Sequence, residues 1–248
     1  MMVHTFIRQS GFACALVAVF MITLNSNGAD TPAEREGMLE AIRESVRDSA
    51  SYTGRSELSD RVMAAMANVP REEFVLPAYR HQAYDNTPLP IEAGQTISQP
   101  LIVALMTDLL DPQPGDVMLE VGTGSGYQAA VLSGLVDHLY SIEIVEELAA
   151  SAAEVLVKLG YNNVTVRAGD GYAGWPEHAP FDGIIVTAAA DKLPPPLLKQ
   201  LKPGGKLVIP VGAKHGYQEL LLVEVDESGE ISKRSVLPVR FVPLTGDR

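Results

Sequence analysis

Cysteine is nearly absent from this chain of 248 residues, in which Cys14 is the only one. It lies in an apolar N-terminal run, so no cysteine remains if that run is removed. An intramolecular disulfide is excluded, and the composition is compatible with an oxidising compartment without demonstrating one. The histidines show no metal-ligand spacing, so no metal is expected. They are His4, His81, His138, His178 and His215.

Basic residues are also scarce: 19 lysines and arginines stand against 31 acidic residues, for a formal net charge of −12. Binding nucleic-acid phosphates requires clustered lysine and arginine, and no such cluster occurs, so nucleic acid is not an expected partner. Hydrophobic residues make up 46% of the chain, which is enough for a sizeable core. The length fits one domain, or one domain with a small appendage.

The N-terminal apolar run, residues 11–24, has 14 residues, whereas a membrane-spanning helix needs about 20. Arg8 precedes it and the small residues 26–29 follow it, an arrangement typical of an export signal. The sequence therefore predicts a cleaved signal peptide over residues 1–28 and an exported, periplasmic protein without stable membrane association. Two alternatives stay open: an uncleaved anchor, and a true start at Met38. The mature chain would have 18 basic and 31 acidic residues, a net charge of −13.

The rest of the chain divides into a helical part, 29–116, and a part from 117 to 248 in which strands and helices alternate. Such alternation predicts a doubly wound α/β fold, mostly parallel, with helices on both faces. Two final strands flank a turn and predict an antiparallel hairpin. The expected helices cover 31–48, 60–68, 72–79, 99–110, 127–135, 145–159 and 195–201, with a loop at 84–98. The expected strands cover 117–121, 138–142, 164–168, 183–187, 206–211, 219–225 and 231–241.

The most informative stretch is the apolar strand 117–121, which runs directly into Gly122, Gly124 and Gly126. Glycine at alternate positions lets the backbone approach a ligand closely, and the helix that follows would begin at that ligand. A dinucleotide-binding fingerprint would need its third glycine at position 127, but the residue there is Tyr127. The observed G-x-G-x-G spacing instead resembles S-adenosylmethionine-dependent methyltransferases. A glycine-rich turn without a ligand is the plainer alternative.

Two further strand ends have residues suited to a nucleoside. Glu143 lies 21 residues after Gly122, where a carboxylate can bind both ribose hydroxyls. Asp170 and Gly171 follow the next strand and could read an adenine edge, although Asp-Gly is also an ordinary turn pair. Glu120 either reaches the cofactor through water or is a solvated strand residue. The predicted cofactor-binding residues are Gly122, Thr123, Gly124, Ser125, Gly126, Glu143, Asp170 and Gly171.

A second informative segment is the loop Gln95–Pro100, in which Ser98 would cap the helix that follows. This string resembles the signature of protein-L-isoaspartate O-methyltransferases, which initiate repair of isomerised aspartyl and deamidated asparaginyl residues. The tail Val239–Leu244 is the other specific match. Further matches lie at 69–75, 119–127, 169–171, 184–189 and 203–205, so that the resemblance spans about 38–246.

The resemblance implies a Rossmann-like methyltransferase sheet with a substrate loop within 29–116 and an S-adenosyl-L-methionine-binding core over 117–248, together one structural domain. It implies isoaspartyl-containing proteins and peptides as partners, with Ser98 as the active-site serine. Thr96 and Ser98 would bind the substrate together with Val239, Arg240 and Phe241. The family is generally cytoplasmic, which is the alternative to export for this chain.

Methyl transfer to a carboxylate suits these residue types. The acceptor is already ionised near neutral pH and the leaving group is a neutral thioether, so no general base is needed. Alignment of two bound reactants would supply the rate, an effect worth about 7–11 kcal/mol in good cases. Ser98 would donate a hydrogen bond and would not act as a nucleophile. A methyltransferase of another carboxylic acid and a non-catalytic binding module of the same fold are the alternatives.

Overall fold

The computed structural model describes residues 32–213 and 216–246. The predicted signal peptide, 1–28, lies outside the described residues, and so does Cys14. None of the described helices is long and apolar enough to cross a membrane.

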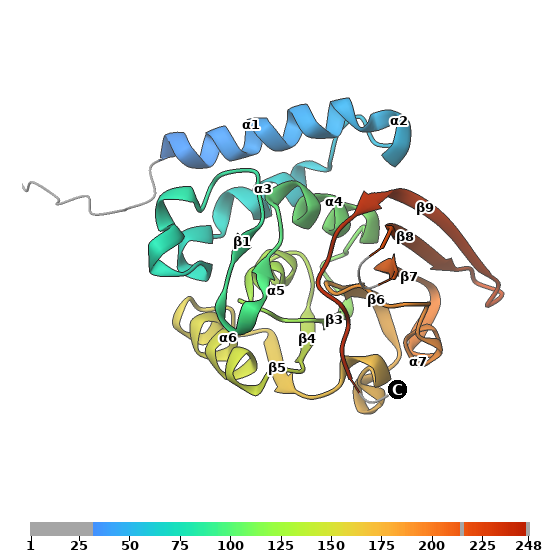
Figure 1. Ribbon diagram of the computed structural model, residues 1–248. Coiled ribbons are helices and arrows are strands. Elements are labelled where there is room, and N and C mark those ends of the chain that lie inside the picture. The colour runs from blue at the N-terminus through green and yellow to red at the C-terminus, as the bar shows by residue number, and fades with distance from the viewer. Residues whose placement is uncertain (1–31, 214–215, 247–248) are drawn as a thin grey trace, which may run out of the picture.

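Helices precede the sheet and lie along one side of the molecule (Figure 1). They are α1 (Pro32–Asp48), α2 (Ala50–Thr53), α3 (Asp60–Asn68), the 3₁₀ turns η1 (Arg71–Phe74) and η2 (Pro77–Gln82), and α4 (Pro100–Leu110). One prediction here is wrong: 72–79 is not a single helix. Pro77 lacks an N–H and disfavours helical backbone at Leu76, which is extended at ψ 145°, so two short turns form instead.

The stretch 84–98, predicted as a loop, contains a small hairpin. Strand β1 (Leu89–Pro90) pairs antiparallel with β2 (Thr96–Ile97), and the turn η3 (Glu92–Gly94) lies between them. Turn residues occupy most of this stretch, and two-residue strands are too short to show a period of two. Leu89 and Ile97 are buried, and they anchor the hairpin to the core.

Seven strands form the main sheet in the order β5-β4-β3-β6-β7-β8-β9. The first five run parallel, and β8 and β9 add the predicted antiparallel pair. This confirms the doubly wound α/β prediction. The strands are β3 (Val117–Val121), β4 (His138–Glu143), β5 (Val164–Ala168), β6 (Phe181–Val186), β7 (Leu201–Gly212), β8 (Gln218–Val225) and β9 (Ile231–Val239).

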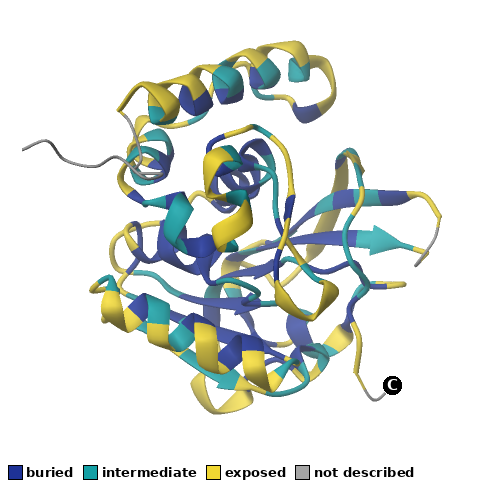
Figure 2. Cartoon of the chain, turned by 60° about the vertical axis from the view of Figure 1, so that its left-hand side comes forward, coloured by how far each residue is buried: buried dark blue, intermediate teal, exposed yellow. Residues whose placement is uncertain are grey.

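Helices cover both faces of the sheet. The connecting elements are α5 (Tyr127–Ser133), α6 (Glu146–Lys158), η4 (Gly171–Ala173), η5 (Pro176–His178) and α7 (Pro195–Leu198). One core cluster joins α4, α5 and α6 to the N-terminal helices, and a second lies on the face covered by α7. Figure 2 shows buried residues along the sheet and exposed residues on the outward faces of the peripheral helices.

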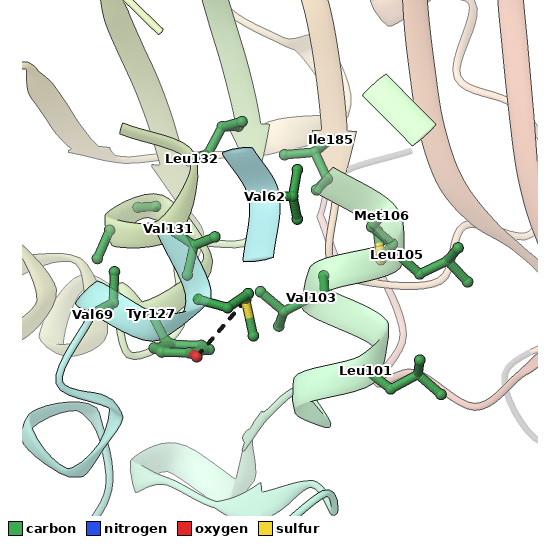
Figure 3. Packing of buried hydrophobic residues seen from close by; sticks show 14 of the residues in the cluster. Val62, Val69, Leu101, Val103, Leu105, Met106, Tyr127, Val131, Leu132 and Ile185 are labelled. Carbon is green, nitrogen blue, oxygen red and sulfur yellow. Dashed lines mark hydrogen bonds between the residues drawn. The ribbon is translucent and has the colours of Figure 1, made fainter. Parts of the chain in front are cut away.

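Tyr127 lies at the centre of the first cluster and is 1% exposed. Figure 3 shows its ring close to residues of α3 and α4, with its hydroxyl 4.0 Å from the Met66 sulfur. Phe74 meets the same ring edge-on at 5.7 Å between centroids. A glycine at 127 would leave this space empty, so the residue that breaks the dinucleotide fingerprint also fills the core.

Asp108 connects the N-terminal helices to α4. It is 6% exposed, and one carboxylate oxygen accepts the Ser59 N–H at 2.8 Å, at the start of α3. The other oxygen lies 3.3 Å from Arg55 Nε. The hydrogen bond to a buried carboxylate fixes where α3 packs on α4.

We expect Asp108→Ala to lower the free energy of unfolding by roughly 2–3 kcal/mol, because it leaves the Ser59 N–H without its acceptor. Asp108→Asn keeps an acceptor and loses only the pair with half-exposed Arg55, so its loss should be about 1 kcal/mol or less. Urea unfolding of both variants measures the difference. Equal losses would show that the ion pair, and not the hydrogen bond, stabilises this junction.

Candidate active site

The candidate site lies where the order of the strands reverses. From β3 the chain adds β4 and β5 on one side, then returns to place β6 on the other side of β3. Ligands of open α/β sheets bind beyond the carboxyl ends of the strands at such a reversal. Gly122 follows β3 and Thr187 follows β6, and the Thr187 hydroxyl donates to the Gly122 carbonyl. A Cβ at Gly122 would come within 2.4 Å of that hydroxyl oxygen, so a side chain has no room there.

The glycine loop, residues 122–126, is left-handed at each glycine: φ is 99° at Gly122, 53° at Gly124 and 90° at Gly126. Glu143, at the end of β4, holds this loop. Its carboxylate accepts the Gly124 N–H at 2.8 Å and the Val145 N–H at 3.0 Å. The loop and the predicted ribose-binding acid therefore form one unit.

A cavity borders the glycine loop, and most of the predicted cofactor residues line it. They are Gly122, Thr123, Gly124, Ser125, Glu143 and Gly171. Gly126 occupies the N-cap position of α5 behind them, where an added Cβ would lie 3.4 Å from Ala152 and Leu156. Asp170 does not line the cavity. Its carboxylate accepts the Tyr172 N–H at 2.9 Å, and the chain at Gly246 passes over it.

The Ser98 loop connects β2 to α4 and borders the same cavity. The prediction that Ser98 caps α4 is wrong. The helix begins at Pro100, Gln99 occupies the cap position without a side-chain bond, and Asn86 Oδ1 accepts the Leu101 N–H at 3.0 Å instead. Asn86, and not Ser98, therefore caps α4. The Ser98 hydroxyl makes no hydrogen bond to any described residue.

A second cavity, of about 480 Å³, opens beside the first. The predicted substrate residues Val239, Arg240 and Phe241 line it together with Thr96 and Ser98. Gln218 on β8 fixes this wall, because its side-chain amide accepts the Phe241 N–H at 2.7 Å and donates to the Phe241 carbonyl at 3.2 Å. Residues far apart in the sequence thus line one cavity.

Four residues line both cavities: Thr96, Ser98, Thr187 and Val242. They mark the place where a group bound in one cavity would meet a group bound in the other. Three of them have hydroxyl groups and none is charged. The junction therefore offers hydrogen-bond donors and no general base.

Several lining residues were not among the predicted site residues. Thr187 ends an expected strand at the reversal point, and that position is its signal. Ile144 follows Glu143, lines the first cavity and stays 39% exposed, which is unusual for isoleucine. The tail residues 242–245 line the first cavity as well, and the Leu244 N–H donates to the Ala189 carbonyl at 2.7 Å. Figure 1 shows this tail running from β9 along the ends of the parallel strands.

Trp175 is a packing residue. It is 8% exposed in the second core cluster, with its ring against Tyr140 and under Arg167. Among the described residues, no group of three or more His, Cys, Asp or Glu side chains is arranged to hold a metal ion.

The family model for protein-L-isoaspartate(D-aspartate) O-methyltransferases matches residues 50–248. The chain belongs to this family. The isoaspartate methyltransferase 2 of Syntrophobacter fumaroxidans is 56% identical to it over 238 residues, which cover 94% of this chain and 96% of the relative. Isoaspartate methyltransferase 2 of a Polaromonas species is 58% identical over 211 residues, which cover 85% of this chain and 100% of the relative.

Solved members of the isoaspartate methyltransferase family have the same fold. One protein-L-isoaspartate O-methyltransferase matches with a TM-score of 0.74 at 30% identity, over 86% of this chain and 66% of the other. A second, from Plasmodium falciparum in complex with S-adenosyl-L-homocysteine, matches with a TM-score of 0.69 at 26% identity. This match covers 85% of this chain and 98% of the other.

Glu120 lies behind the cavity and not in it. It is fully buried on β3, where one carboxyl oxygen accepts from the Ser141 hydroxyl at 2.5 Å and the other has no partner. Ser141 in turn bonds to the Thr123 hydroxyl of the glycine loop at 2.6 Å. Neither sequence-based alternative holds, because Glu120 is not solvated and does not line the cavity. Burial raises the pKa of Glu120 to about 8, and nearby Glu143 adds to the shift.

Because the pKa of Glu120 is higher in the folded chain than its ordinary value of 4.5, the folded state keeps this proton while the unfolded state loses it. This contribution to stability is present below pH 4.5 and is lost as pH rises to about 8. We expect Glu120→Gln to abolish this decrease of stability with rising pH. At pH 8 the free energy of unfolding of the variant should exceed that of wild type by roughly 3–5 kcal/mol. Unfolding curves at pH 5, 6.5 and 8 measure this. Parallel pH profiles for the two proteins would contradict it.

Proposed function

We infer that the chain transfers a methyl group from S-adenosyl-L-methionine to the free carboxylate of L-isoaspartyl residues in proteins and peptides. Membership of the isoaspartate methyltransferase family supports this reaction. The observation that carries it in the structure is the junction of the two cavities at Thr96, Ser98, Thr187 and Val242. One cavity suits a nucleoside cofactor and the other suits a peptide.

The first cavity has the groups that the cofactor requires. The Glu143 carboxylate can accept hydrogen bonds from ribose hydroxyls, and Ile142 and Ile144 offer apolar surface to an aromatic ring. The glycine loop allows close approach of backbone. Gly171 lines the same space, while Asp170 would act from behind it by fixing the η4 turn. When bound, S-adenosyl-L-methionine supplies an electrophilic methyl group on a positively charged sulfur.

The second cavity receives the peptide in this proposal. Val239, Arg240 and Phe241 form its wall, and Gln218 holds the Phe241 backbone in place. The Ser98 hydroxyl, which makes no bond to a described residue, would donate to the substrate carboxylate, and Thr96 would line its approach. The uncharged junction suits a nucleophile that needs orientation and no proton transfer.

We expect Ser98→Ala to lower kcat/KM for an isoaspartyl peptide roughly 10- to 100-fold, because one hydrogen bond to a charged carboxylate is lost. Affinity for S-adenosyl-L-methionine, measured by calorimetry, should stay within about 2-fold, since Ser98 is assigned to the substrate. Ser235→Ala, an equal change on the exposed face of β9, serves as the control and should leave both values unchanged.

The matching aspartyl peptide separates this reaction from methylation of any carboxylate. Wild type should methylate the isoaspartyl peptide and leave the aspartyl peptide unmodified. Equal rates on the two peptides would overturn the isoaspartyl assignment. Full activity of Ser98→Ala would instead overturn only the role of Ser98.

Export to the periplasm is a second part of the proposal. Arg8, the apolar run and the small residues that follow support a signal peptide over 1–28. The alignment with the Syntrophobacter relative leaves 6% of this chain unmatched, about 15 residues, which is fewer than the signal peptide contains. Part of the leader therefore has a counterpart in that relative.

Fractionation of cells and N-terminal sequencing of the native protein test export. The periplasmic fraction should contain a chain that begins near residue 29. A chain in the cytoplasm that begins at Met1 or Met38 would contradict the proposal and favour the usual location of the resembling family.

A further inference from the structure

Arg71, the first residue of η1, is the largest fully buried side chain of the described structure, at 0% exposure. No carboxylate of the described residues pairs with it. A buried guanidinium without a counter-charge costs several kcal/mol of stability, and an apolar side chain of similar length would avoid that cost. Burial lowers the pKa of Arg71, yet arginine remains protonated at neutral pH. Its presence therefore requires an explanation beyond packing.

The contacts of Arg71 join three separate segments. Its Nε donates to the Ala83 carbonyl at 2.8 Å, and its Nη2 donates to the Ser98 carbonyl at 2.7 Å. The guanidinium lies over the Tyr127 ring, 4.5 Å from the centroid. Arginine's planar fork can make such bonds in fixed directions at the same time, which lysine cannot do.

Two of these segments are the two halves of the active site. Ser98 belongs to the loop at the junction of the cavities, and Tyr127 directly follows the last glycine of the glycine loop. The Tyr127 ring is fixed in the core by Phe74 and the residues shown in Figure 3. Arg71 thus connects the loop of Ser98, at the junction of the cavities, to a ring buried in the core.

We propose that Arg71 is a positioning residue that holds the Ser98 loop in register with the glycine loop, so that the substrate carboxylate and the methyl donor meet in line. This proposal rests on the proposed role of Ser98. It follows from the chemistry, because a reaction that depends on alignment alone is sensitive to displacements of about 1 Å, which can cost roughly 100-fold in rate. Arg71 touches neither reactant and acts only through Ser98.

A double-mutant cycle tests this connection. Arg71→Met keeps the length of the side chain and removes both donors, so kcat for the isoaspartyl peptide should fall roughly 10- to 100-fold. The affinity for S-adenosyl-L-methionine and the stoichiometry of its binding should stay near the wild-type values. The stoichiometry also reports which fraction of the variant is folded. In the Ser98→Ala background the same change should have less than about a 3-fold further effect, because the two residues act as a unit.

Arg35→Met is the matched control. Arg35 also donates to a backbone carbonyl, that of Ala67 at 2.7 Å, and also lies over a tyrosine ring, that of Tyr84 at 5.6 Å. Its loss should lower thermal stability without lowering kcat. If Arg71→Met does not fold, Arg71→Lys replaces it in the cycle, since lysine keeps the charge but loses the fork.

Each outcome decides the proposal. Independent, multiplicative effects of Arg71→Met and Ser98→Ala would overturn it, and so would wild-type kcat in a folded Arg71 variant. Loss of cofactor binding in step with kcat would show a merely structural role. Full activity of Ser98→Ala would overturn the proposed role of Ser98 together with this inference, whereas impaired Ser98→Ala beside normal Arg71→Met would overturn the inference alone.

Discussion

The whole site depends on the contact between the ends of β3 and β6. Gly122 and Thr187 lie so close that no side chain fits at 122, and the threonine hydroxyl closes the gap with a hydrogen bond to the Gly122 carbonyl. This contact exists because the strand order reverses at β3, which leaves the two carboxyl ends adjacent and uncovered. The glycine loop opens on one side of it. The Ser98 loop and the C-terminal tail line the same cavity as the glycine loop, and Thr187 borders both cavities.

Local patterns of the sequence predicted those parts of the structure that local physics determines. The strand-glycine-helix run at 117–133, the acid at Glu143 and the alternation of strands and helices need no partner distant in the chain to be recognised. The bounds of α3 were predicted without error, because Ser59 and Pro70 mark its two ends. Pro77 is the signal that 72–79 cannot be one helix, because proline lacks an N–H and disfavours helical backbone at Leu76.

Long-range hydrogen bonds from side chains to the backbone were beyond prediction. Asn86 caps α4 from 15 positions away, and this cap frees Ser98 from the role that its place in the sequence suggests. Gln218 on β8 fixes the Phe241 backbone from 23 positions away, and Arg71 reaches Ser98 across 27 positions. None of these residue types is rare, and nothing in their spacing points to the partner. Glu120 is similar, because only the fold reveals that its carboxyl is sealed behind the loop that it supports.

The tail after β9 has a consequence for when activity can arise. Val239, Arg240 and Phe241 complete the wall of one cavity, and residues 242–245 complete the wall of the other. These residues lie at or after the end of β9, which follows every other strand of the main sheet in the chain. A nascent chain that has been synthesised only as far as β9 can therefore form the glycine loop and most of the sheet while it still lacks one side of each cavity. The methyltransferase acquires its two-sided site only after this tail has been added.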